Sequence, residues 1–123
     1  MNMARRRAPE PAVLELRLSG TVDEESIHDL LSDPVPGAGE VPSRWLVHTC
    51  TAQLRFDSLR LADLAERLGR SCARPRGVRV HAVAADALTC GCLRMLAAHL
   101  AQTPIRLQVY PDAETALEAL LAA

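Results

Sequence analysis

The chain has 123 residues, 49% of them hydrophobic and 24% charged, and its formal net charge is −1 at pH 7. This length and composition are typical of one globular domain and exclude a disordered chain. The absence of a basic excess argues against nucleic-acid binding, and an aromatic content of 2% leaves few rings to stack on bases. All 14 basic residues are arginine, which excludes a Schiff-base or phosphate-loop lysine.

The hydrophobic runs all fall short of the roughly 20 residues that span a bilayer. Residues 1–11 contain three arginines without an apolar segment after them, so they predict a flexible basic tail rather than a secretory signal. Residues 12–123 are expected to form a single domain. The arginine bias and abundant alanine are typical of a GC-rich bacterial genome. We expect a cytoplasmic protein with four reduced cysteines, Cys50, Cys72, Cys90 and Cys92.

The first predicted strand covers residues 12–18, where Val and Leu alternate with charged residues. Thr21 and Glu24 have the spacing of a capping box, in which a hydroxyl and a carboxylate satisfy free backbone N–H groups. They predict a helix over residues 22–32. A loop rich in proline and glycine follows, and the next strand is predicted over residues 45–50.

A second helix is expected to begin at Asp57 or Ser58, because both residue types are preferred helix caps. Its apolar stripe is formed by Leu61, Leu64, Ala65 and Leu68. A third strand is predicted over residues 78–84, and Asp86 is expected to cap a helix over residues 87–101. The inner face of that helix is predicted to carry Leu88, Cys92, Met95, Leu96 and His99.

The fourth strand is predicted over residues 105–110, and Asp112 is expected to cap the last helix. The residues of that helix expected in the core are Ala116, Leu117, Leu120 and Leu121. Strands that alternate with helices imply a mostly parallel sheet with right-handed crossovers. The fold class is therefore expected to be α/β, with four strand–helix units and a four-stranded, mostly parallel sheet flanked by helices.

Three local patterns, in this order along the chain, are similar to the STAS domain of bacterial anti-sigma factor antagonists. They are the Gly-x-x-Asp turn Gly20–Asp23, the strand-to-Asp-Ser segment Leu46–Ser58, and the closing strand and helix Val109–Leu117. A fourth stretch, Gly91–Met95, resembles a STAS-like subgroup related to CRAL-TRIO lipid-transfer domains.

The resemblance implies a STAS-like fold over residues 12–122 and a non-enzymatic regulatory or protein-interaction module in bacterial signalling. The surface implied to dock the partner surrounds Asp57, Ser58 and Arg60. The partner implied is a protein, namely an anti-sigma factor or a kinase-like regulator. The alternative, implied by the CRAL-TRIO-related stretch, is a domain that binds a small anionic ligand or a lipid. An apolar cavity distinguishes the two, because a lipid carrier needs one.

The chain departs from the antagonist pattern Asp-Ser-Ser/Thr-Gly, in which the second hydroxyl residue accepts a phosphate. The corresponding residues are Asp57, Ser58, Leu59 and Arg60, and leucine has no hydroxyl group. Ser58 would accept a phosphate only from a kinase that tolerates a shifted hydroxyl. The family's acidic residue in the second strand corresponds to Thr49. We therefore expect constitutive binding instead of a phosphorylation switch.

Candidate anion sites are the arginines at positions 5–7, the basic loop before the third strand and the start of the second helix. Arg74 and Arg76 lie in the loop before the third strand, and Arg79 follows them. The helix start at Asp57 and Ser58 offers backbone N–H groups that favour an anion. Each place also has an ordinary explanation, since exposed arginines are common in loops and Asp and Ser are frequent helix caps.

The cysteines and histidines form no recognisable metal or catalytic motif. Cys90 and Cys92 are two residues apart on a predicted helix and point to different faces, so joint metal ligation or a disulfide is difficult. Cys50 and Cys92 are expected to be buried small hydrophobic residues. His48 shares a face of the second predicted strand with Cys50, and a small cluster with His81 on the third strand is conceivable, but no serine and acidic partner complete a triad. We expect no metal, no cofactor and no enzymatic activity.

Overall fold

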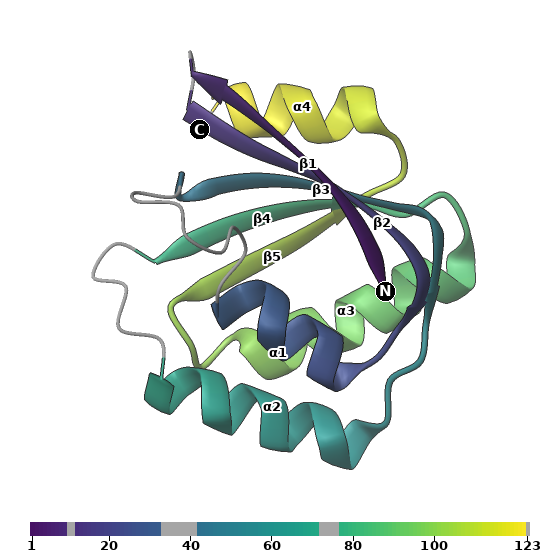
Figure 1. The fold of residues 1–123 in the computed structure, drawn as a ribbon, viewed down its shortest axis with the longest axis vertical. Coiled ribbons are helices and arrows are strands. Elements are labelled where there is room, and N and C mark those ends of the chain that lie inside the picture. Colours follow the sequence, from purple (N-terminus) through teal and green to yellow (C-terminus); the bar gives the residue numbers. More distant parts are fainter. Residues whose placement is uncertain (10–11, 33–41, 72–76, 123) are drawn as a thin grey trace.

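The computed structural model describes residues 1–9, 12–32, 42–71 and 77–122 (Figure 1). In these residues five strands form one sheet in the order β1-β2-β3-β4-β5. β1 pairs with β2 antiparallel, and β2 to β5 are parallel to one another. This confirms the α/β class and the mostly parallel sheet, with one strand more than predicted. The strands are β1 (Asn2–Pro9), β2 (Ala12–Val22), β3 (Arg44–Leu54), β4 (Val78–Val83) and β5 (Ile105–Tyr110).

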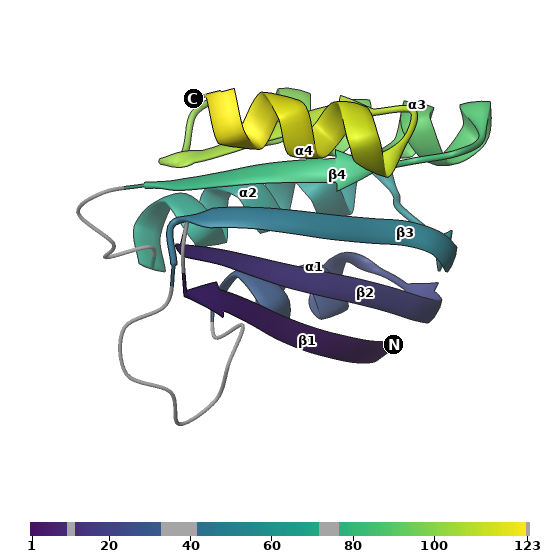
Figure 2. The same cartoon turned by 90° about the horizontal axis from the view of Figure 1, so that it is seen from above.

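Helices cover both faces of the sheet. Three of them, α1, α2 and α3, lie on one face, and α4 lies alone on the other (Figure 1). α4 runs antiparallel to β3, β4 and β5, so its carboxyl-terminal end points towards the amino ends of those strands (Figure 2). The helices are α1 (Glu24–Ser32), α2 (Ser58–Ser71), α3 (Ala87–Leu100) and α4 (Ala113–Ala122).

Residues 2–9 form an edge strand, so the expectation of a flexible tail is wrong for them. They pair with β2 along their whole length, and Met3 packs against the core between the sheet and the helices α1 to α3. This strand is not predicted from the sequence, because consecutive arginines give no alternation of apolar and polar residues. Backbone pairing with β2 holds such an edge, and arginine side chains on it discourage pairing with other chains.

Alternating strand residues enter the cores on the two faces of the sheet, and a third, small cluster contains Ala82, Ala84 and Leu93. The larger core lies between the sheet and the three helices α1 to α3. It contains Trp45, which is fully buried and donates a hydrogen bond of 2.7 Å from its indole Nε1 to the Pro42 carbonyl oxygen. The smaller core lies under α4. Its members are Val13, Leu46, Val83, Ala116 and Leu120.

The predicted inner faces of two helices are partly wrong. On α4, Leu120 is fully buried, but Leu117 and Leu121 are 42% and 51% exposed, because α4 has a neighbouring layer on one side only. On α3, Leu88 is 79% exposed. The buried residues of α3 are Leu93, Leu96 and Leu100. Both helices are apolar around much of their circumference, so periodicity alone does not determine which side packs.

An aspartate caps each of the four described helices. Asp86 and Asp112 cap α3 and α4 as predicted, each accepting a hydrogen bond of 2.7 Å from a backbone amide of the first turn. α1 is capped by Asp23, which accepts a hydrogen bond of 2.9 Å from the Ser26 amide. The predicted cap, Thr21, instead lies in β2. Thr21 and Glu24 have the spacing of a capping box, but Asp23 is also a strong cap and directly precedes the first residue of α1. The cap is therefore Asp23 and not Thr21.

Candidate functional site at the start of α2

The turn before α2 lies at the carboxyl edge of the parallel strands, immediately after β3 (Figure 1). Asp57, Ser58 and Arg60 are exposed there, as the sequence analysis requires of a docking surface. Leu59 is also exposed, with 84% of its surface accessible. The carboxyl edge of an open α/β sheet is where loops and helix starts converge on ligands. The four residues therefore form one accessible surface.

The Asp57 carboxylate caps α2. Its Oδ1 accepts hydrogen bonds from the backbone amides of Leu59 at 2.9 Å and Arg60 at 3.3 Å. These bonds satisfy the N–H groups that an external anion would need. The start of α2 is thus closed to a phosphate or other anion bound through the backbone, and Asp57 acts mainly in holding the turn.

The same arrangement recurs along this edge of the sheet. Hydrogen bonds, chiefly from the backbone amide three residues further on, lower the pKa of the caps Asp23, Asp86 and Asp112. These carboxylates are therefore fully charged at neutral pH. Each described helix start at the carboxyl edge therefore already holds its own anion.

Leu59 is the site residue whose exposure the sequence analysis missed. The buried residues of α2 are Leu61, Leu64 and Leu68. At 100° per residue, Leu59 lies on the opposite side of the helix from this stripe. A helical projection of residues 58–68 would have revealed an exposed leucine. In the comparison with the STAS pattern, Leu59 is notable only for its lack of a hydroxyl group.

Thr49 occupies the position at which the STAS pattern has an acidic residue. It is 2% exposed, and its Oγ1 donates a hydrogen bond of 2.7 Å to the Val83 carbonyl oxygen. This bond links the neighbouring strands β3 and β4. The position therefore has a structural role and carries no charge.

The histidines and cysteines of the central strands do not form one cluster. His48 Nε2 lies 3.2 Å from a Glu15 carboxylate oxygen. Cys50 is exposed and Cys92 is half-buried, so the expectation that both are buried is wrong. His81 opposes Leu46 in the β3–β4 register and His48 opposes Val83, so the two histidines are diagonal neighbours and not register partners. The three described cysteines, including Cys90, are free thiols, and Cys72 lies outside the described residues.

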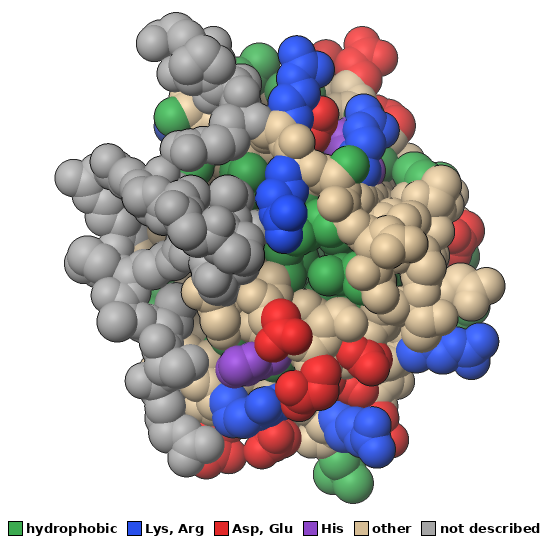
Figure 3. All heavy atoms as spheres, viewed as in Figure 1, with side chains coloured by type: hydrophobic (Ala, Val, Ile, Leu, Met, Phe, Trp, Pro, Cys, Tyr) green, Lys and Arg blue, Asp and Glu red, His purple; other side chains and the backbone are tan. Residues whose placement is uncertain are grey.

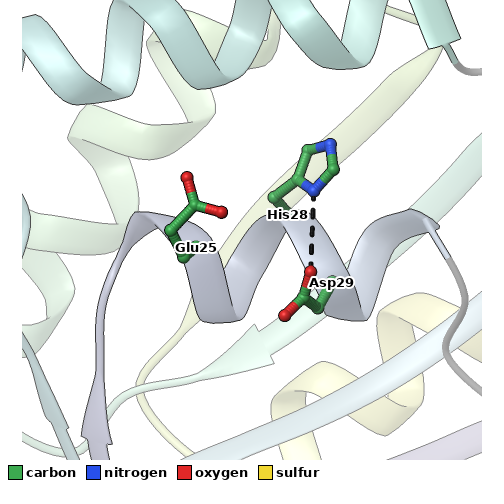
Figure 4. Close-up of side chains that lie close together, drawn as sticks. All are labelled: Glu25, His28 and Asp29. Carbon is green, nitrogen blue, oxygen red and sulfur yellow. Dashed lines mark ion pairs between the residues drawn. The ribbon is translucent and has the colours of Figure 1, made fainter.

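A candidate cation site lies on α1, where Glu25, His28 and Asp29 bring their ligand atoms within 4.8 Å of one another (Figure 4). One carboxylate of this cluster is already paired, however, because an Arg67 guanidinium nitrogen lies 2.8 Å from Glu25. Arg67 also pairs with Asp63 at 3.1 Å, and Figure 3 shows the acidic and basic side chains gathered over α1 and α2. This arrangement is an ion-pair network between two helices.

An apolar cavity lies between the sheet and the helices α1 and α3. Its volume is about 40 Å³, and its lining is hydrophobic apart from Thr49. For comparison, an engineered apolar cavity of about 150 Å³ binds one benzene molecule. An acyl chain therefore does not fit unless the helices separate, and the cavity gives no support to the lipid-binding alternative.

The basic loop that contains Arg74 and Arg76 lies outside the described residues. The next arginine, Arg79, is described and lies exposed on β4. His81 follows on the same face of that strand and is 5% exposed. Its ring stacks on Tyr110, with centroids 5.5 Å apart and an interplanar angle of 12°. Burial, and then the charges of Arg79 and Arg44, lower the pKa of His81, so its imidazole is neutral at pH 7.

This lowered pKa predicts how stability depends on pH. The unfolded chain takes up a proton on His81 near the ordinary pKa of 6.5, whereas the folded chain takes it up only at lower pH. The contribution of neutral His81 to the free energy of unfolding is therefore full above pH 6.5 and is lost as the pH falls towards the folded-state pKa. Urea denaturation between pH 7 and pH 5 should show falling stability in the native sequence and a smaller fall in His81→Phe. An equal fall in both proteins, with His99→Gln as the control, would contradict this assignment.

Comparison with known proteins gives the fold. No family model matches the chain, and no curated protein matches it at a significant level. The chain is similar to an uncharacterized protein from the DUF3478 family with a SpoIIAA-like fold, from Shewanella loihica. The TM-score is 0.55 at 16% sequence identity, and the match covers 97% of this chain and 92% of that chain.

The SpoIIAA-like fold is the fold of STAS domains and anti-sigma factor antagonists. The protein therefore has a STAS-type α/β fold, as the order of its sequence patterns indicates. Among the described residues, none of the helices combines the length and hydropathy needed to cross a bilayer.

Proposed function

We propose that the chain is a non-enzymatic STAS-type module that docks a protein partner through Ser58, Leu59 and Arg60. The observation that carries the proposal is Leu59, which is 84% exposed at the position where the STAS pattern has its phosphate acceptor. Single exposed leucines are ordinary on protein surfaces. This one differs because it stands on a turn fixed by the Asp57 cap, at the edge of the sheet where the fold resemblance expects the partner.

The chemistry of this surface favours constitutive binding. A leucine offers an apolar contact that no kinase modifies, and Arg60 beside it offers a charge for an acidic group of the partner. The fold resemblance favours an anti-sigma factor or a kinase-like regulator as that partner. Ser58 is the first residue of α2, where added negative charge would stabilise the helix through its dipole. Phosphorylation at Ser58 would therefore not unfold the turn.

Photo-crosslinking tests the surface directly. A photoreactive residue in place of Leu59 is expected to form a crosslink to one protein in an extract of the source cells. The matched control is the same residue in place of Leu121, which is 51% exposed but lies on α4, on the other face of the sheet. Arg60→Glu should remove the Leu59 crosslink and weaken binding of the identified partner at least about tenfold, while the circular dichroism spectrum stays native.

Charge changes elsewhere distinguish this surface from the basic loop. Ser58→Asp adds the charge that a phosphate would bring, and Arg74→Glu with Arg76→Glu reverses the charge of the loop. The docking proposal fails if Arg60→Glu and Ser58→Asp both leave binding unchanged and the double loop variant abolishes it. Crosslinks of equal yield from positions 59 and 121 would equally reject it.

A further inference from the structure

Three arginines stand side by side at the amino ends of neighbouring parallel strands. Arg44 of β3 is the register partner of Arg79 of β4, which in turn is the partner of Arg106 of β5. Register partners point to the same face of a sheet on strands about 4.8 Å apart. This face is the one under α4, because Leu46, two residues beyond Arg44, packs with Leu120. We call Arg44, Arg79 and Arg106 the arginine row.

The charges of Arg79 and Arg106, two members of the arginine row, are offset little by the described residues. Arg106 turns back and donates hydrogen bonds to the backbone carbonyl oxygens of Ala101, Thr103 and Ile105. Among the described residues, no carboxylate forms an ion pair with Arg79 or Arg106. The carboxyl-terminal end of α4 points towards the amino ends of β3 and β4 (Figure 2), but a helix terminus carries only about half a unit of negative charge. Like charges in register also repel one another, so the row favours an added anion.

A buried polar atom lies next to the row. His81 is two residues beyond Arg79 on the same strand face, and its Nδ1 is buried without a hydrogen-bond partner among the described residues. The stack on Tyr110 holds the ring in place. The charges of Arg79 and Arg44 both act on the imidazole, so the ring lies within electrostatic reach of both guanidinium groups. Buried polar atoms without a partner are rare in folded proteins.

We propose that the arginine row is a binding site for a compact oxyanion, with Arg79 and Arg44 contacting its oxygens and His81 at its inner end. A guanidinium group matches the geometry of phosphate and carboxylate oxygens, and an imidazole with its proton on Nδ1 donates one further hydrogen bond. The ligand class is a phosphate or carboxylate group, free or part of a larger molecule. The site lies at the amino edge of the sheet, opposite the start of α2, and so does not depend on the docking proposal.

Nuclear magnetic resonance titration with inorganic phosphate, and separately with acetate, tests the site at constant pH and ionic strength. The side-chain nitrogen signals of His81 and Arg79 are expected to shift and saturate with phosphate, while those of Arg17 and Arg60 do not. Saturation with acetate as well would extend the ligand class to carboxylates, and saturation with phosphate alone would restrict it to phosphoryl groups. Arg79→Gln should weaken phosphate binding about tenfold, the effect of losing one charged hydrogen bond.

Arg17→Gln is the matched control, because Arg17 lies on the same sheet face, is 63% exposed and lies 4.0 Å from Glu15. Phosphate affinity should be unchanged in this variant. The proposal is overturned if the His81 and Arg79 signals do not saturate, or if all arginine signals shift alike, as general screening predicts. Equal losses in Arg79→Gln and Arg17→Gln would also overturn it. The shifts of the native sequence decide the question even if a variant does not fold.

Discussion

Leu120→Ala is expected to lower the free energy of unfolding by about 2–5 kcal/mol. Leu120 is fully buried in the smaller core, between α4 and the sheet. Truncation removes its contacts with Leu46 and Val83 and leaves a cavity, because strand residues beneath a single helix cannot move far to fill it. Chemical denaturation followed by circular dichroism would measure the change.

Leu117→Ala is the matched control on the same helix. Leu117 is 42% exposed, so the same truncation should change the free energy of unfolding by less than about 1 kcal/mol. The two residues are three positions apart, so helix propensity affects both variants alike. Equal losses would show that α4 is rotated about its axis relative to the structure described above.

Gly77→Ala is expected to destabilise the protein by about 2–5 kcal/mol, through two separate effects. Gly77 has a backbone φ of 62°, in the left-handed region that disfavours any residue with a Cβ. A Cβ added there would also lie 2.7 Å from the Pro104 carbonyl oxygen. That oxygen is held by the Val78 amide at 3.2 Å, where β4 and β5 begin to pair, so it cannot withdraw without weakening the sheet.

Gly20→Ala separates the two effects. Gly20 has a φ of 76°, but a Cβ there would meet no atom within 4 Å. Its replacement should therefore lose only the conformational part, about 1–2 kcal/mol. Thermal and urea denaturation of both variants would give the difference. If Gly77→Ala loses no more than Gly20→Ala, the close approach of the β4 and β5 starts is not maintained in solution.

Short sequence patterns predicted those helix starts and strands that are determined by a few neighbouring residues. Asp86 and Asp112 were identified as caps because a capping aspartate acts on its own helix start, and the central strands were found from short apolar runs. β1 was not predicted, because this segment is a strand through its backbone pairing with β2 and its residue types do not indicate a strand. Which leucines of α4 are buried depends on the layer that the helix meets, and that layer is assembled from distant strands.

The same distinction applies to the candidate sites. The exposed turn at Asp57, Ser58 and Arg60 follows from the end of a strand and the start of a helix, and both are local features. The arginine row could not be predicted, because it depends on the register of three strands far apart in the sequence. The burial of His81 likewise requires α4 to fold back over the sheet.

The aspartate caps and the arginine row place opposite charges at opposite edges of the sheet, although the net charge is only −1. Asp23, Asp57, Asp86 and Asp112 each follow a parallel strand, whereas the row stands where such strands begin. A charged partner approaching within about 8 Å, the Debye length at physiological salt, would experience a torque that turns one edge of the sheet towards it. Salt would then slow association by weakening this alignment before contact, although the overall charge barely attracts or repels.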